Sequence, residues 1–180
     1  MTVLCDLAVK YGTDKGTKYK GGSGHGYTPF YHKLFQDIQV KRLLEIGICW
    51  EVQAASLRMW EEYFPEAEII GLDIDPAKMV NDGRIKSYLV NQASGESLGV
   101  FVFAHPGPYD VIIDDGSHAL YDQIISAIYL MPCLNKNGVY IVEDVQNARG
   151  LRDALSMYST ETIEFNPDAV DGRIVLIRHK

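Results

Sequence analysis

Two short apolar runs in this chain, at 111–113 and 139–142, are each followed directly by two acidic residues. The pairs are Asp114–Asp115 and Glu143–Asp144, and His118 follows the first pair closely. Apolar runs of this kind are typical of buried parallel strands, whose carboxyl ends meet at one edge of an open α/β sheet, where ligands bind. Four carboxylates at one edge repel one another unless a cation lies among them. A hard divalent metal is the cation that carboxylate oxygens favour.

Strand and helix patterns alternate along the rest of the chain, which is typical of a doubly wound fold. We expect strands at 42–47, 68–74, 85–90, 109–115, 138–144, 162–166 and 172–179. We expect helices at 2–11, 28–37 (capped by Thr28, with Pro29 in its first turn), 51–64, after Pro76, and at 95–104, 119–131 and 148–158. These elements predict an α/β fold with a Rossmann-like, mostly parallel seven-stranded sheet and a C-terminal antiparallel hairpin. We expect one domain over 1–180, with N-terminal helices and a glycine-rich loop in 1–40 and the Rossmann-like core in 41–180.

The segment 12–27 contains six glycines and predicts an irregular, mobile loop. For Lys15 and His25, a solvated position in this loop is favoured over contact with a substrate.

Composition excludes several classes of protein. The formal net charge is −7, and the lysines and arginines are scattered, which argues against nucleic acid as a partner. The three cysteines form no CxxC pair and favour a reducing compartment. The chain has no apolar stretch of membrane-span length and no signal pattern at its N-terminus, so we expect a cytoplasmic protein without a membrane partner.

The turn after the strand at 42–47 indicates what the pocket holds. A chain that leaves a strand through Gly47 and enters a helix presents free backbone N–H groups. The dinucleotide motif GxGxxG is absent, and Glu45 precedes the glycine, where it would repel a pyrophosphate. Asp73, at the end of the next strand, lies where ribose hydroxyls are usually bound. The pattern favours a nucleoside with a positively charged, non-phosphorylated tail.

The motifs LLEIG, GLDIDP, YDVIIDDGSHALYDQ and GVYIVEDVQ resemble those of class I S-adenosylmethionine-dependent methyltransferases. They are most similar to the macrolide and rhamnosyl sugar O-methyltransferases, whose relatives are often called cephalosporin hydroxylase-like. The upstream segments YGTDKG and HGYTPFYHKLF and the segment SLRMW extend the resemblance over most of residues 11–146.

The resemblance implies S-adenosylmethionine and Mg²⁺ as cofactors and a hydroxylated small molecule, such as a sugar, as the acceptor. It implies His118 as the base that removes the hydroxyl proton. The implied metal ligands are Asp115, Glu143 and Asp144. The implied cofactor-binding residues are Tyr27, Thr28, Glu45, Gly47, Ser56, Asp73 and Gln92, and we add Asp114 to this set.

Several alternatives stay open. Neighbouring strand residues face opposite sides, so Asp114 pointing away from the metal is one of them. The turn after Gly47 has Cys49, Glu51 and Ala54–Ala55 where the family usually has further glycines. This difference favours a second hypothesis, in which the chain is a cofactor-binding but inactive relative. A nicotinamide-dependent oxidoreductase is a third reading, against which the missing GxGxxG counts. A homo-oligomer is also left open.

Overall fold

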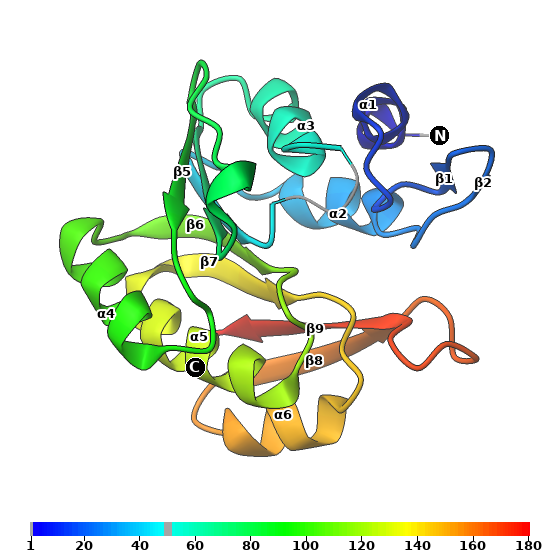
Figure 1. Ribbon diagram of the computed structural model, residues 1–180. Coiled ribbons are helices and arrows are strands. Elements are labelled where there is room, and N and C mark those ends of the chain that lie inside the picture. Colours follow the sequence, from blue (N-terminus) through cyan, green and yellow to red (C-terminus); the bar gives the residue numbers. More distant parts are fainter. Residues whose placement is uncertain (1, 49–51) are drawn as a thin grey trace.

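The computed structural model describes residues 2–48 and 52–180, and its centre is a mostly parallel β-sheet (Figure 1). Its strands run in the order β5-β4-β3-β6-β7-β9-β8. The first five are parallel, whereas β9 pairs antiparallel with both β7 and β8. The predicted Rossmann-like sheet with a C-terminal hairpin is therefore confirmed. The strands are β3 (Arg42–Ile46), β4 (Glu68–Asp73), β5 (Ile85–Leu89), β6 (Tyr109–Asp114), β7 (Leu134–Val142), β8 (Ser159–Glu164) and β9 (Arg173–Arg178).

Helices cover both faces of this sheet, because alternate strand residues supply an apolar surface to each side. Leu43 and Val111 pack on one side with α1 (Val3–Tyr11), α2 (Thr28–Phe35) and α3 (Ala55–Tyr63). Leu44 and Ile112 pack on the other side with α4 (Gly95–Ala104), α5 (Leu120–Leu130) and α6 (Ala148–Ala154), as Figure 1 shows. Two 3₁₀ turns, η1 (Pro76–Lys78) and η2 (Met131–Cys133), complete the described elements. No helix among the described residues has the length and apolar content needed to cross a bilayer.

Element boundaries differ from the predicted ones in a few places. Strand β7 begins at Leu134 instead of 138, because Leu134 already pairs with Tyr109 of β6. Thr28 does not cap α2: the helix begins at Thr28 itself, and the Thr28 hydroxyl contacts Cys5 Sγ at 3.2 Å. Residue 51, the predicted start of the third helix, lies outside the described residues.

The glycine-rich segment 12–27 is not the irregular loop that its composition predicts. It contains a short hairpin, formed by β1 (Lys18–Tyr19) and β2 (Gly22–Ser23). Below the hairpin its two arms are hydrogen-bonded: the amide of His25 donates to the Asp14 carbonyl at 2.8 Å, and that of Gly26 to the Gly16 carbonyl at 2.9 Å. A Cβ atom on Gly24 would lie 2.5 Å from the Asp14 carbonyl oxygen. Glycine here permits close packing of the backbone rather than disorder.

Candidate active site

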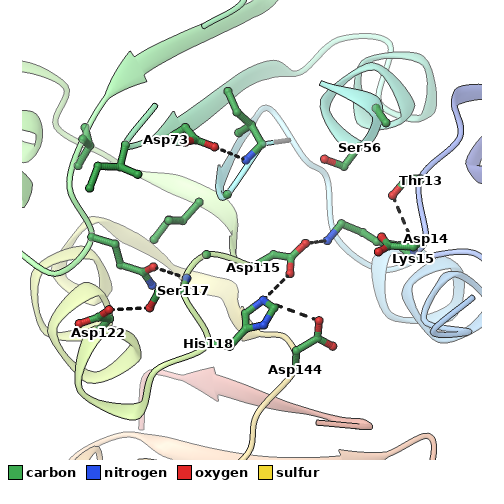
Figure 2. Close-up of a pocket in the computed structure, with 18 of the residues that line it drawn as sticks. Thr13, Asp14, Lys15, Ser56, Asp73, Asp115, Ser117, His118, Asp122 and Asp144 are labelled. Carbon is green, nitrogen blue, oxygen red and sulfur yellow. Dashed lines mark hydrogen bonds and ion pairs between the residues drawn. The ribbon is translucent and has the colours of Figure 1, made fainter. Parts of the chain in front are cut away.

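A pocket of about 440 Å³ lies at the carboxyl ends of β3, β4 and β6 (Figure 2). This volume is within the usual range of small-molecule pockets. The segment between α1 and the hairpin forms one wall, and the turns after the parallel strands form the others. Seven of the predicted site residues line it: Gly47, Ser56, Asp73, Gln92, Asp115, His118 and Asp144. The other five, Tyr27, Thr28, Glu45, Asp114 and Glu143, do not line it.

At Gly47 the turn after β3 directly contacts the backbone that follows β6. Its φ is +80°, and a Cβ atom there would lie 2.0 Å from the carbonyl oxygen of Asp115. Only glycine fits this position without moving the backbone that carries Asp115. Two of the predicted departures from the family glycines, Cys49 and Glu51, lie outside the described residues.

The Asp73 carboxylate, at the end of the neighbouring strand β4, stabilises the turn after β3. It accepts hydrogen bonds from the amide of Ile48 at 3.2 Å and from that of Asp75 at 2.9 Å. Asp73 lines the pocket together with Ile74. A carboxylate at the end of the second parallel strand is where ribose hydroxyls are bound in related folds.

Asp114 points away from the pocket, which is the alternative that strand alternation predicts. It is fully buried, and its oxygens accept from Gln92 Nε2 at 2.5 Å, from the Ser126 hydroxyl and from the Tyr140 hydroxyl at 3.2 Å. Burial raises the pKa of Asp114 to about 6, although these donors act against it. Gln92 in turn accepts from the amide of Ser117 at 3.0 Å, so Asp114 orients a residue of the pocket wall.

The side chains of Asp115, His118 and Asp144 converge at one end of the pocket (Figure 2). Donor atoms of these three residues all lie within 4.8 Å of one another. His118 Nε2 is 3.1 Å from Asp115 Oδ1 and 3.8 Å from Asp144 Oδ2. The hydrogen bond to Asp115 raises the pKa of His118 above its ordinary value, while burial opposes the rise. Two carboxylates converge beside the imidazole, and carboxylate oxygens suit a hard divalent ion, so these residues fit the predicted metal.

Lys15 lies among the acids. The sequence predicted a solvated loop position for this lysine, and that prediction was wrong. Its side chain is 2% exposed, and its Nζ is 2.5 Å from Asp115 Oδ2, 2.6 Å from Glu143 Oε2 and 3.2 Å from Glu45 Oε1. Burial opposes the charge, yet the three carboxylates raise the pKa of Lys15 well above its ordinary value. The cation that the clustered acids require is therefore supplied in part by the chain itself.

Glu143 and Glu45 are buried behind the pocket because Lys15 and aromatic donors hold them there. Glu143 accepts from the Tyr31 hydroxyl at 2.7 Å as well as from Lys15. Glu45 accepts from Trp60 Nε1 at 2.9 Å, and its other oxygen faces Lys15. Neither carboxylate lines the pocket.

Tyr27 supports the site from behind instead of closing over it. The ring is 1% exposed, and its hydroxyl donates to Asp144 Oδ1. Thr28 is buried against α1 through Cys5. The predicted direct contact of Tyr27 and Thr28 with the cofactor therefore has no counterpart in the pocket lining.

Seven polar lining residues were not predicted as site residues: Thr13, Asp14, Lys15, Tyr19, Asn91, Ser117 and Asp122. The Ser117 hydroxyl donates to Asp122 Oδ2 at 2.6 Å, one turn into α5. The SH…LYD spacing within 117–122 is the signal that could have placed Asp122 at the pocket. Asp14 and Lys15 come from a segment about 100 positions away from Asp115, and no local pattern indicates that they meet.

Known proteins that are similar to this chain in sequence include O-methyltransferases. No protein-family model matches the chain. It is 36% identical over 151 residues to mycinamicin VI 2''-O-methyltransferase of Micromonospora griseorubida, a match that covers 81% of this chain and 36% of the relative. It is also 36% identical over 151 residues to demethylmacrocin O-methyltransferase of Streptomyces fradiae, covering 81% of this chain and 37% of that protein. Both of these proteins are named O-methyltransferases, and the chain is similar to them in sequence.

The fold agrees with this relationship. The solved structure of MycE methyltransferase, in complex with Mg and S-adenosylhomocysteine, superposes with a TM-score of 0.79 at 27% sequence identity. That superposition covers 98% of this chain and 54% of MycE. The chain thus spans about a third of the length of the relatives it matches in sequence and about half of MycE.

Proposed function

We propose that this chain is an S-adenosylmethionine-dependent, divalent-metal-dependent O-methyltransferase that acts on a hydroxyl of a small molecule, such as a sugar. One observation carries the proposal: the turn at Gly47, the carboxylate of Asp73 and the cluster of Asp115, His118 and Asp144 all line the same pocket. A methyl donor and a hydroxyl acceptor must meet within such a space for transfer to occur.

The donor end of the pocket is made by the turns after β3, β4 and β5. Gly47 lines this end with its backbone, which we assign to the methionine part of the cofactor. Asp73 is the partner that we propose for the ribose hydroxyls. Gln92 and Ser117, linked at 3.0 Å, form the wall that we assign to the adenine.

The acceptor end is the acid and histidine cluster. A neutral His118 accepts the proton of the acceptor hydroxyl, the oxygen forms a bond to the methyl carbon, and the sulfur–methyl bond breaks to leave S-adenosylhomocysteine. Asp115 orients the imidazole through its 3.1 Å contact and stabilises its charged form. A divalent cation bound here would lower the pKa of the hydroxyl and orient it.

We propose that two of the predicted acids, Asp115 and Asp144, hold this cation, and that the third, Glu143, supports them from behind the pocket. Asp115 and Asp144 direct oxygens into the pocket beside His118. Glu143 is connected to Asp115 through the shared ammonium of Lys15. Tyr27 and Tyr31 donate to Asp144 and Glu143 respectively, and such supporting donors commonly fix metal-binding carboxylates.

Two further relatives support a glycosylated acceptor, because they are named as O-methyltransferases of rhamnosyl tetracenomycin-C compounds. Since the pocket draws residues from both 12–19 and 46–144, we also propose that residues 1–180 act as one methyltransferase domain.

The test is methyl transfer itself. The full chain is incubated with S-adenosylmethionine, Mg²⁺ and a panel of glycosylated and free hydroxylated acceptors, and both S-adenosylhomocysteine and methylated product are measured by mass spectrometry. Product that depends on acceptor, cofactor and metal supports the proposal. Tight binding of S-adenosylhomocysteine without turnover of any acceptor would favour the inactive relative instead.

A further inference from the structure

Lys15 has both its backbone and its ammonium group fixed within the site. Its carbonyl oxygen accepts from the amides of Tyr27 at 3.0 Å and Thr28 at 3.2 Å, at the start of α2. Its Nζ lies between carboxylates from β3 and from the first positions after β6 and β7, at the distances given above. Burying an ammonium is costly, and such a group persists only where several partners surround it. The glycine-rich segment 12–27 therefore places the ammonium group of Lys15 at the edge of the sheet.

The two oxygens of Asp115 have different partners. Oδ2 is 2.5 Å from Lys15 Nζ, whereas Oδ1 is 3.1 Å from His118 Nε2 (Figure 2). A carboxylate held by one oxygen cannot rotate freely to present either oxygen to a ligand. Lys15 thus restricts the orientation of the acid that contacts the histidine.

We propose that Lys15 is a positioning residue of the methyl-transfer site: its ammonium holds Asp115 by Oδ2 and so presents Oδ1 to His118 and to the metal position. This inference rests on the proposed function. Lys15 also lines the pocket, but the role proposed for it acts through Asp115, on how well the acids bind a cation and orient His118.

If Lys15 only neutralised the acids, its removal would have the opposite effect on metal affinity from the one that a positioning role predicts. A fixed positive charge near a cation site repels the cation, so removing that charge alone would strengthen metal binding. Loss of positioning would weaken it, because the acid would no longer be held in its binding orientation. The sign of the change therefore separates a positioning role from a neutralising one.

The test measures Mn²⁺ affinity of the purified full chain from the electron paramagnetic resonance signal of the free ion, without substrate or cofactor. Lys15→Met is the first variant. Because it leaves buried Glu45 and Glu143 without their cation, a second variant, Lys15→Met/Glu45→Gln, removes one of those charges too, and Glu45→Gln serves as its reference. Lys18→Met is the matched control, since Lys18 is an exposed lysine on the same segment. Thermal melting of each variant is measured in parallel.

We expect the folded Lys15 variants to bind Mn²⁺ about 10-fold or more weakly than their references. Lys18→Met should stay within about twofold of the wild type, because an exposed charge is screened. Unchanged or tighter binding in the Lys15 variants overturns the proposal. The proposal is also overturned if both Lys15 variants fail to fold while Glu45→Gln folds, because that result would assign Lys15 a structural role. Absence of Mn²⁺ binding by the wild type would instead contradict the proposed metal dependence, and the inference would fall with it.

Discussion

His118 and Asp144 face each other across 3.8 Å, and both have left-handed backbone conformations, with φ of +58° and +51°. Left-handed conformations are uncommon for residues other than glycine and are often found at functional sites, where surrounding structure maintains them. Here the surrounding structure includes the Tyr27 hydroxyl on Asp144 and the Asp115 carboxylate on His118. Backbone strain, side-chain convergence and the pocket thus coincide at one place in the fold.

The first prediction concerns His118. Asparagine tolerates a left-handed backbone better than alanine, so His118→Asn removes the base with little change in the turn. We expect kcat for methyl transfer to fall about 10²- to 10⁴-fold, while affinity for S-adenosylhomocysteine stays unchanged. His179→Asn, remote at the end of the chain, is the control and should keep its rate. A variant of His118 with full kcat would exclude it as the base.

The second prediction concerns the metal. Treatment with EDTA should abolish methyl transfer, and Mg²⁺ or Mn²⁺ should restore it, because the cluster of acids is proposed to bind a hard cation. Asp144→Asn should weaken Mn²⁺ binding about 10-fold or more, whereas Asp153→Asn, on the exposed face of α6, should have no effect. Equal activity in EDTA and in Mg²⁺ would contradict metal dependence.

The third prediction separates two costs at Gly47. Gly21 has nearly the same φ, +81°, but nothing lies within 4 Å of a Cβ built on it, whereas a Cβ on Gly47 would lie 2.0 Å from the Asp115 carbonyl oxygen. Gly21→Ala should therefore lower the free energy of unfolding by about 1 kcal/mol, from backbone strain alone. Gly47→Ala should lower it by about 3 kcal/mol or more, because Asp115 must also move. Urea denaturation measures both, and similar losses would mean that no close contact exists at Gly47.

The fourth prediction concerns the ribose site. Asp73→Ala should weaken S-adenosylhomocysteine binding about 10-fold or more, since a hydrogen bond to a charged group contributes about 1.5–3 kcal/mol. Asp75→Ala is a matched control: Asp75 lies two residues away and accepts from the amide of Ala77 outside the pocket lining. Calorimetry should give the Asp75 variant wild-type affinity. Equal affinities for the two variants would remove Asp73 from the cofactor site.

Much of the sheet can be predicted from the sequence, because apolar runs and turn residues are local signals. The acids after β6 and β7 could be placed at one edge for the same reason. The orientation of each acid could not: Asp114 and Asp115 are adjacent, yet one is held by Ser126 and the other by Lys15. That distinction depends on contacts between segments far apart in the chain.

The largest error of the sequence interpretation concerns Lys15, and its cause is physical. Clustered acids require a cation, and from the sequence alone a metal is the predicted one. A lysine in a glycine-rich segment gives no local sign of burial, because its burial depends on the close pairing of 14–16 with 24–26 and on carboxylates about 100 residues away. Tyr27 and Tyr31 were likewise not predicted as donors to Asp144 and Glu143.

The most direct measurement is calorimetric titration of the full chain with S-adenosylhomocysteine, with and without Mg²⁺, and with NAD as a control. Our account predicts saturable binding of S-adenosylhomocysteine to one site and no binding of NAD. Absence of S-adenosylhomocysteine binding by the folded chain under both conditions would contradict the assignment of this pocket to a methyl donor.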